Sequence, residues 1–271
     1  MPELPEVETV ARQLARAIVG KTVARVVVFA PKSVRGRPLT PLVGRAVTGV
    51  DRRAKLIRIA CGEWTLLVHL KMTGRLLRLP AGHPTGPYTR AVFTFTDGTQ
   101  LFFDDIRRFG YLMLLPSADA EAHFVREGYG PEPLAPDFDA NALAACLARR
   151  PRARIKAALL DQTCIAGIGN IYADETLFAA GIRPTRPAGR ITRAERAALW
   201  TAIRDILTRS IAARGSSSVN YRDTAGRSGN FVRFLQVYGR NGDPCPKGDG
   251  GVIHKTVVAG RGTHWCPKHQ K

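Results

Sequence analysis

Pro2 is the first residue of the chain with a distinct chemical capacity. It follows Met1, and an initiator Met before so small a residue is normally removed, which leaves Pro2 with a secondary amine. Such an amine can attack an electrophilic carbon and form an iminium ion. The pKa of an α-amino group is about 8, and the positive end of a following helix favours its unprotonated form. The adjacent Glu3 can serve as general acid or base, although ordinary helix-start chemistry explains these two residues equally.

The run GIGNIYA is the second motif that bears on chemistry. Gly167 and Gly169 begin like a dinucleotide-binding fingerprint, but Tyr172 stands where the third glycine belongs and no clear strand precedes the run. We therefore predict Asn170 at the N-cap of a helix that ends near Gly181, with glycines that let backbone N–H groups approach a phosphate.

The net charge of the chain indicates a polyanionic binding partner but does not distinguish among polyanions. Lys and Arg number 41 against 22 Asp and Glu, a formal net charge of +19. This excess suits a polyanion, since cations that neutralise phosphates release condensed counterions. DNA, RNA and anionic membranes all fit.

The start of the chain and its cysteines indicate the compartment. The N-terminus is acidic, unlike a signal peptide, and no apolar run reaches bilayer length. We expect a cytoplasmic protein. The five cysteines are scattered and odd in number, so we expect most of them to be buried small side chains rather than part of a disulfide framework. Cys245 and Cys266 are a separate case.

Hydrophobic periodicity divides the chain into three parts. A helix is predicted from Pro5 to Gly20, and short runs rich in Val, Leu, Thr and Phe over 22–115 predict a β-sandwich or barrel. A Gly- and Pro-rich linker over 128–136 precedes helical spacing to about Arg214. The predicted α+β fold has several domains: a β-sandwich over 1–130, a helical DNA-binding domain over 139–230 that includes a mobile loop over 215–230, and a β-ribbon finger over 231–271.

Six segments in a fixed order carry a family resemblance. They are MPELPEVET, RRAKLIR, HLKMTGRL, DDIRRFG, LLDQTCIAGIGNIYADETLF and QVYGRNGDPC. With them the chain resembles the formamidopyrimidine-DNA glycosylase family, whose relatives include endonuclease VIII, from its first residue to its last. The resemblance implies a helix-two-turn-helix element in the helical domain, a zinc-type finger and DNA in the cleft between domains.

The resemblance also implies a bifunctional DNA glycosylase and abasic-site lyase of bacterial base excision repair. Pro2 would attack C1′ of the damaged nucleotide, and Glu3 would donate a proton to the opening sugar. Lys55 matches the lysine of β-elimination, and Arg261 matches an arginine that contacts phosphate and assists the final elimination. From the sequence alone, an exposed strand lysine and a generic phosphate contact are the plainer alternatives.

A flipped nucleotide leaves a hole in the duplex that the protein must fill. Met72, Arg107 and Phe109 match the family's intercalating residues, with core packing as the alternative for Met72 and Phe109. The resemblance further places Lys156, Asn170 and Tyr238 on the backbone of the lesion strand. The expected additional phosphate contacts, for which a solvated surface is the alternative, are Arg90, Arg108 and Arg152.

The implied partner is double-stranded DNA with oxidised bases or abasic sites, bound by a monomer near the bacterial nucleoid. ELPEVET and the loop NYRDTAGRSGNF resemble the branch that removes 8-oxoguanine and formamidopyrimidines. The alternatives are an endonuclease VIII-like enzyme for oxidised pyrimidines, a non-catalytic binder of damaged DNA and a basic RNA-binding protein.

The finger departs from the family pattern of two closely spaced cysteine pairs. Gly248 and His269 stand at the second position of each pair, and counting back from Cys266 over the family's spacing reaches Asp249. Asp and His are both zinc ligands. We therefore predict one structural Zn²⁺ per chain, with His254 or His264 as the substitute ligand if Asp249 faces away and a metal-free finger as the alternative; the predicted ligands are Cys245, Asp249, Cys266 and His269.

Overall fold

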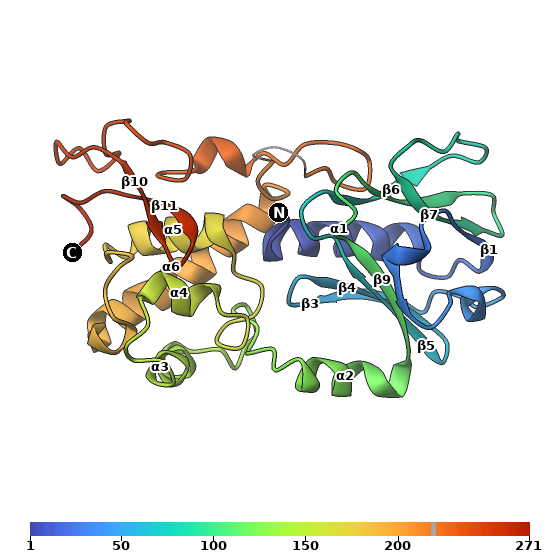
Figure 1. Ribbon diagram of the computed structural model, residues 1–271, viewed down its shortest axis with the longest axis horizontal. Helices are drawn as coiled ribbons and strands as arrows, with labels where there is room; N and C mark the ends of the chain where they lie inside the picture. Colours follow the sequence, from blue (N-terminus) through green and yellow to red (C-terminus); the bar gives the residue numbers. More distant parts are fainter. Residues whose placement is uncertain (218–220) are drawn as a thin grey trace. The chain divides into compact units, whose positions relative to one another are not determined.

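Helix α1 (Leu4–Ile18) begins the chain in the computed structural model (Figure 1). Glu3 is its N-cap residue, and the side chain of Glu6 closes a capping box by accepting the backbone N–H of Glu3 at 2.8 Å. The helix ends before Gly20, whose φ of +87° suits glycine. The predicted helix is confirmed.

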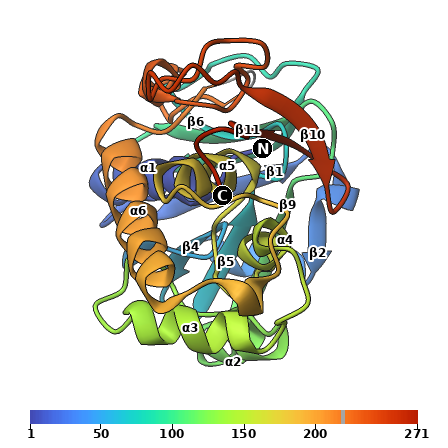
Figure 2. The ribbon, with the colours of Figure 1, turned by 90° about the vertical axis from the view of Figure 1, so that its left-hand side faces the viewer.

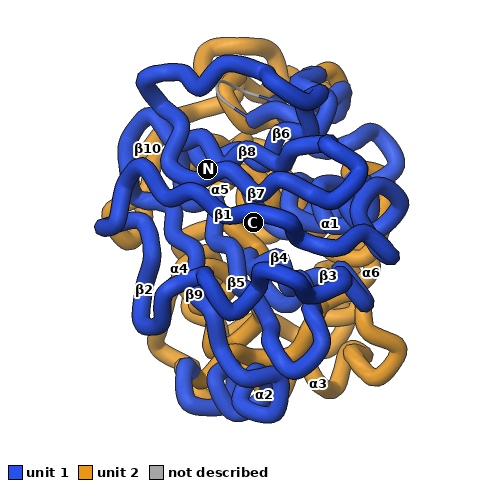
Figure 3. Tube along the Cα trace, turned by 90° about the vertical axis from the view of Figure 1, so that its right-hand side faces the viewer, with its two compact units in different colours: residues 1–127, 211–232 blue, residues 128–210, 233–271 orange. Residues whose placement is uncertain are grey.

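The structure describes residues 1–217 and 221–271. Ser218, Val219 and Asn220, which belong to the predicted loop over 215–230, lie outside the described residues. The chain forms two compact units, distinguished by colour in Figure 3: residues 1–127 with 211–232, and residues 128–210 with 233–271. We refer to them as unit 1 and unit 2.

Unit 1 contains two sheets, one in the order β1-β7-β8-β6 and one in the order β2-β9-β5-β4-β3. Neighbouring strands are antiparallel except for the parallel pair β2 and β9. The predicted β-sandwich is confirmed. Its strands are β1 (Val23–Val28), β2 (Val34–Gly36), β3 (Gly49–Arg53), β4 (Leu56–Cys61), β5 (Trp64–His69), β6 (Gly74–Leu79), β7 (Thr89–Phe95), β8 (Gln100–Asp105) and β9 (Tyr111–Pro116).

The core of unit 1 joins α1 to both sheets. Val10 of α1 lies in one buried cluster with Ile57 of β4 and Phe93 of β7. Burial of this apolar stripe fixes the helix, and with it the N-terminus, against the sandwich. The remaining elements of the unit are η1 (Pro31–Ser33), η2 (Thr40–Leu42) and α2 (Ser117–Arg126).

Unit 2 combines helices with one β-hairpin (Figure 2). In the hairpin, Val258 pairs with Arg261 across Ala259 and Gly260, both of which have positive φ, as a tight two-residue turn requires. The helical interpretation of this region and the β-ribbon are confirmed. The elements are α3 (Ala140–Ala148), α4 (Ile155–Leu160), α5 (Asn170–Ala179), η3 (Ala188–Arg190), α6 (Arg193–Ala212), η4 (Phe231–Phe234), β10 (His254–Val258) and β11 (Arg261–Trp265), with the end of α6 and the start of η4 assigned to unit 1.

Residues 211–232 group with unit 1, whereas the sequence interpretation placed 139–230 in one domain. Hydrogen bonds give the physical reason. The backbone N–H of Ser216 donates to Glu6 of α1, and the side chain of Gln13 accepts from Thr224. Both bonded residues, Ser216 and Thr224, lie within the loop predicted over 215–230, so these bonds hold parts of that loop against α1. Among the described helices, none combines the length and apolar character needed to cross a bilayer.

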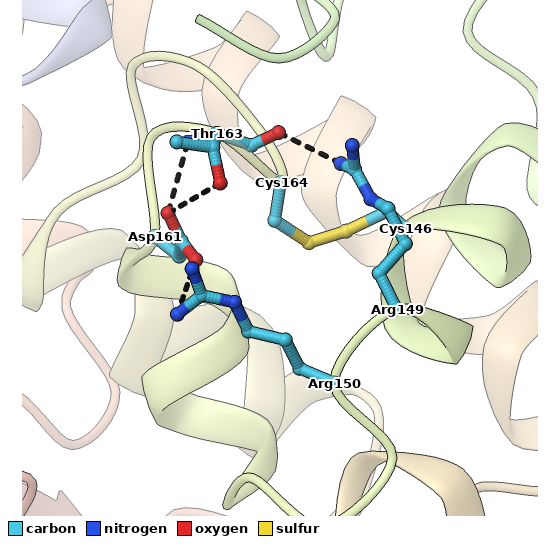
Figure 4. Close-up of a disulfide and its surroundings, with 6 residues drawn as sticks. All are labelled: Cys146, Arg149, Arg150, Asp161, Thr163 and Cys164. Carbon is cyan, nitrogen blue, oxygen red and sulfur yellow. Dashed lines mark hydrogen bonds and ion pairs between the residues drawn. A yellow bond between two sulfur atoms is a disulfide. The ribbon is translucent and has the colours of Figure 1, made fainter. Parts of the chain in front are cut away.

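A disulfide joins Cys146 of α3 to Cys164 in the segment before α5 (Figure 4). This corrects the expectation that these two cysteines are separate buried side chains. Nearby, the carboxylate of Asp161 accepts from the backbone and hydroxyl of Thr163 and pairs with Arg150. Folding brings Cys146 and Cys164 together, with their Cα atoms 5.1 Å apart. Their separation of 18 residues could not reveal that pairing.

Candidate active site

Pro2 and Glu3 lie at the buried start of α1. The chain therefore places the candidate nucleophile at the positive end of a helix, and the candidate proton donor directly after it. Neither residue is part of an exposed tail.

Glu6 links this N-terminus to a distant segment, which sequence reasoning missed. One carboxylate oxygen accepts from Glu3 at 2.8 Å, and the other accepts from the backbone of Ser216 at 2.7 Å. A Cβ on Gly215 would lie 2.8 Å from that second oxygen, so glycine permits the close approach. The capping box was visible in the sequence, but the bond over 210 positions was not.

Lys55 follows Ala54 in the turn between β3 and β4 and is almost completely buried. Arg52 holds the turn against α1, since it donates to the side chain of Glu8 at 2.8 Å and to the carbonyl of Ala54 at 3.0 Å. The alternative of an exposed strand lysine is therefore wrong. Lys55 sits instead on a fixed turn attached to the helix that carries Pro2.

His69 is a further residue that sequence reasoning missed. Burial, together with the nearby Lys71, Lys55 and Arg35, lowers its pKa to about 3. Its Nδ1 accepts the backbone N–H of Lys71 at 3.0 Å, so the single ring proton of the neutral form lies on Nε2. A neutral ring adds no further positive charge beside Lys55 and Lys71.

Met72 and Phe109 project from two loops of unit 1, with exposed fractions of 39% and 51%. The core-packing alternative is therefore wrong for both. The Arg107 guanidinium carbon lies 4.9 Å from the centre of the Phe109 ring. The hydroxyl of Thr73 connects the two loops, because it accepts the backbone N–H of Arg107 at 2.9 Å.

Arg90 is buried and donates twice to the carbonyl of Asp105, at 2.9 and 2.7 Å. Its predicted phosphate contact is corrected to a structural role, since a buried guanidinium committed to a carbonyl does not face solvent. Asp105 in turn accepts from Thr73 and from the backbone of Gly110. This network shapes the loop on which the exposed Arg108 adopts a φ of +60°.

Lys156 in unit 2 is completely buried. Its ammonium pairs with Asp174 at 2.6 Å and donates to the hydroxyl of Thr263 at 2.8 Å and to the carbonyl of Gly262 at 3.1 Å. All three partners belong to the protein itself. The predicted contact between Lys156 and the DNA backbone is therefore corrected to a contact inside the protein.

Asn170 is the first residue of α5, and Gly169 is its N-cap, which shifts the predicted cap by one position. The Asn170 amide donates to the carbonyl of Gly262 at 2.9 Å. Tyr238 is half-buried, and its backbone N–H donates to Glu175 at 2.8 Å. The side chains of Asn170 and Tyr238 are thus partly exposed, on backbone that hydrogen bonds hold in place. Their contacts with DNA stay predictions.

In unit 2, the two arginines predicted to contact phosphate are exposed. Arg152 precedes α4, and Arg261 begins β11 directly after the hairpin turn. An exposed guanidinium on an ordered backbone can reach a phosphate, so both predictions stand as made.

Three of the four predicted metal ligands form a cluster. The ligand atoms of Cys245, Asp249 and Cys266 lie within 4.8 Å of one another. A Cβ on Gly251 would approach the Cys266 sulfur to 2.6 Å and Asp249 to 2.9 Å, so the absence of a side chain there leaves the ligands their space. The set could hold a metal ion. His269 is not part of this cluster; its Nε2 lies 3.0 Å from the carbonyl of Phe178.

The substitute ligands lie elsewhere. His254 is exposed on β10, and the backbone N–H of His264 donates to Asp174 at 2.9 Å. Because Asp249 faces the two cysteines, neither substitute is needed.

Comparison with known proteins covers both units. The N-terminal domain model of formamidopyrimidine-DNA glycosylase matches residues 1–112, and the model of its H2TH domain matches residues 129–222. The formamidopyrimidine-DNA glycosylase of Moorella thermoacetica is 49% identical over 252 residues, which cover 91% of this chain and 92% of that protein.

Solved structures agree with these matches. Lactococcus lactis Fpg in complex with DNA that contains an abasic site is 34% identical, with a TM-score of 0.92 and coverage of 99% of both chains. A mutant of the same enzyme in complex with DNA that contains Fapy-dG gives a TM-score of 0.93 at 34% identity, with 100% of both chains covered. With Pro2 and Glu3 at the start of α1 and both domain models matched, the chain belongs to the formamidopyrimidine-DNA glycosylase family.

Proposed function

We propose that this chain is a monomeric DNA glycosylase and abasic-site lyase that removes oxidised purines from double-stranded DNA. The observation that carries the proposal is the position of Pro2, buried at the N-terminus of α1 and directly before Glu3. The complexes of its relatives with DNA that contains Fapy-dG or an abasic site support this class of substrate.

The proposed chemistry begins after removal of Met1. The Pro2 amine attacks C1′ of the damaged nucleotide, the bond from C1′ to the base breaks, and the base leaves with that electron pair. Glu3 donates a proton to the opening sugar, which leaves an iminium between Pro2 and C1′. Lys55 serves the β-elimination that breaks the strand on one side, and Arg261 serves the δ-elimination on the other.

Base excision also requires side chains that replace the flipped nucleotide in the duplex, and the exposed loops of unit 1 can provide them. Met72 and Phe109 are apolar side chains held out into solvent, and Arg107 can hydrogen-bond the base that loses its partner. Together they can fill the hole left by a flipped nucleotide.

Borohydride trapping tests the assignment of Pro2, because an iminium is reducible. On a duplex that contains 8-oxoguanine, we expect a covalent adduct through Pro2 and loss of base excision in Pro2→Gly. Faster trapping on an oxidised pyrimidine would redirect the substrate assignment to that class. Full activity in protein that retains Met1 would overturn the nucleophile.

For the metal we propose zinc, held by Cys245, Asp249 and Cys266 with His269 as fourth ligand. A carbonyl can only accept, so the contact with Phe178 places the ring proton of His269 on Nε2 and leaves Nδ1 as the ligand atom. The ion would be structural, since four protein ligands leave no open position for substrate. It would hold the ends of the finger that presents Arg261.

A further inference from the structure

Asp174 and Glu175 are consecutive buried carboxylates on α5. The function proposed above uses neither of them. Asp174 pairs with Lys156 of α4 at 2.6 Å through one oxygen and accepts the backbone N–H of His264 of β11 at 2.9 Å through the other. It therefore ties two helices of unit 2 to one strand of the hairpin.

The same network also contacts Gly262, the residue directly after Arg261. Its carbonyl accepts from the Lys156 ammonium at 3.1 Å and from the Asn170 amide at 2.9 Å. Lys156 also donates to the hydroxyl of Thr263 at 2.8 Å. The backbone next to Arg261 is thus held by donors from α4 and α5, which pack against each other, while α5 also packs against β11.

Glu175 holds a different segment. Its carboxylate accepts the backbone N–H groups of Gln236, Val237 and Tyr238 at 2.8, 2.9 and 2.8 Å. The two neighbouring acids of α5 therefore serve two elements, one that carries Tyr238 and one that carries Arg261.

A buried ion pair is a poor way to gain stability, because the desolvation of both charges offsets their attraction. Lys156 and Asp174 supply direction instead, since their hydrogen bonds to Gly262, Thr263 and the backbone of His264 are satisfied by only one position of β11. An apolar contact would tolerate a sliding hairpin.

We propose that Asp174 is a positioning residue for Arg261: through Lys156 and the backbone of His264 it fixes the hairpin from which the Arg261 guanidinium reaches the phosphate released in the final elimination. The inference rests on the proposed function. It separates Asp174 from Glu175, which positions the segment of Tyr238 and so acts on DNA affinity.

The test uses the full-length protein on a duplex with an abasic site, at saturating enzyme, and measures the ratio of δ- to β-elimination product. In Asp174→Asn we expect this ratio to fall, by up to about 100-fold if Arg261 is displaced by about 1 Å, while borohydride trapping through Pro2 persists. The double variant Asp174→Asn/Lys156→Met removes both charges and guards against misfolding of the single variant. Asp205→Asn changes an exposed carboxylate of α6 and should match the wild type.

Glu175→Gln should weaken DNA binding and leave the product ratio unchanged at saturation. An unchanged ratio in the folded double variant would overturn the inference, and so would an equal loss of trapping and of δ-product. A wild-type protein that neither traps nor cleaves would instead refute the proposed function.

Discussion

The hydroxyl of Thr73 accepts the backbone N–H of Arg107 at 2.9 Å and donates to the carboxylate of Asp105. One buried side chain thereby joins the loop of Met72 to the loop of Arg107 and Phe109. The two loops lie 34 positions apart in the sequence. Met72, Arg107 and Phe109 can act as one wedge only if these loops keep this relation.

Thr73→Val should therefore impair the wedge while preserving side-chain volume. It removes the hydroxyl that bonds both the Arg107 N–H and Asp105 and leaves these two groups only their longer bond to each other, at 3.2 Å, at a cost of about 1 kcal/mol. We expect slower excision of 8-oxoguanine in single turnover and a smaller effect on cleavage of an abasic site, where there is no base to flip. Thr73→Ser keeps the hydroxyl and should behave like the wild type. Equal losses on both substrates would contradict this role.

His69 should make folding sensitive to mild acid. Its pKa is lowered from 6.5 to about 3 by burial and by neighbouring cations, so the unfolded chain binds the additional proton first. Stability is then complete above about pH 6.5 and decreases as the pH falls towards 3. Between pH 7.5 and 5, the free energy of unfolding should lose about 2 kcal/mol through this residue. Urea unfolding of wild type and His69→Gln at both pH values measures the difference, and parallel curves would refute it.

The disulfide between Cys146 and Cys164 should contribute measurable stability. Closing a loop over 18 positions restricts the unfolded chain by about 3 kcal/mol in the chain-entropy model. Reductant should lower the urea midpoint of the wild type, and it should leave a Cys146→Ala/Cys164→Ala variant unchanged. If both proteins respond alike, the effect comes from the other thiols.

Salt dependence should distinguish an exposed arginine from a buried lysine. Arg152 is exposed, whereas Lys156 is completely buried and paired with Asp174. Each phosphate contact contributes about 0.9 to the slope of log affinity against log salt. Arg152→Ala should flatten the slope by about that amount, while Lys156→Met should leave it unchanged. A flatter slope in Lys156→Met would show that Lys156 contacts a DNA phosphate after all.

The sequence was sufficient where a signal is local. The stripe of Val7, Val10 and Leu14, together with the capping residues, predicted α1, and alternating apolar runs predicted the sandwich. The order of the motifs identified the family, and with it the candidate residues.

What escaped prediction depends on contacts between distant residues. Lys and Arg are residue types usually found at the surface, which is why Lys156 and Arg90 were predicted to be exposed. Only the fold shows that Lys156 pairs with Asp174 and that Arg90 donates to the carbonyl of Asp105. The bond from Glu6 to Ser216 and the pairing of Cys146 with Cys164 are equally invisible, since no local pattern encodes which segments meet. A charged side chain is expected at the surface unless a buried partner compensates its charge.

The cysteine pattern of the finger departs from that of the family, and metal analysis tests whether the finger still binds zinc. Protein purified without chelator should contain about one zinc per chain, since a site of four protein ligands is typical of structural zinc. Asp249→Ala and His269→Ala should each lose most of the metal, because each removes one of four ligands. Asp249→Cys should retain zinc and bind it more tightly, since a thiolate replaces a harder carboxylate. Asp243→Ala, which changes a carboxylate of the same segment outside the cluster, serves as control. Absence of zinc, together with full lyase activity in chelator, would show instead that Cys245, Asp249 and Cys266 hold the finger through their own hydrogen bonds.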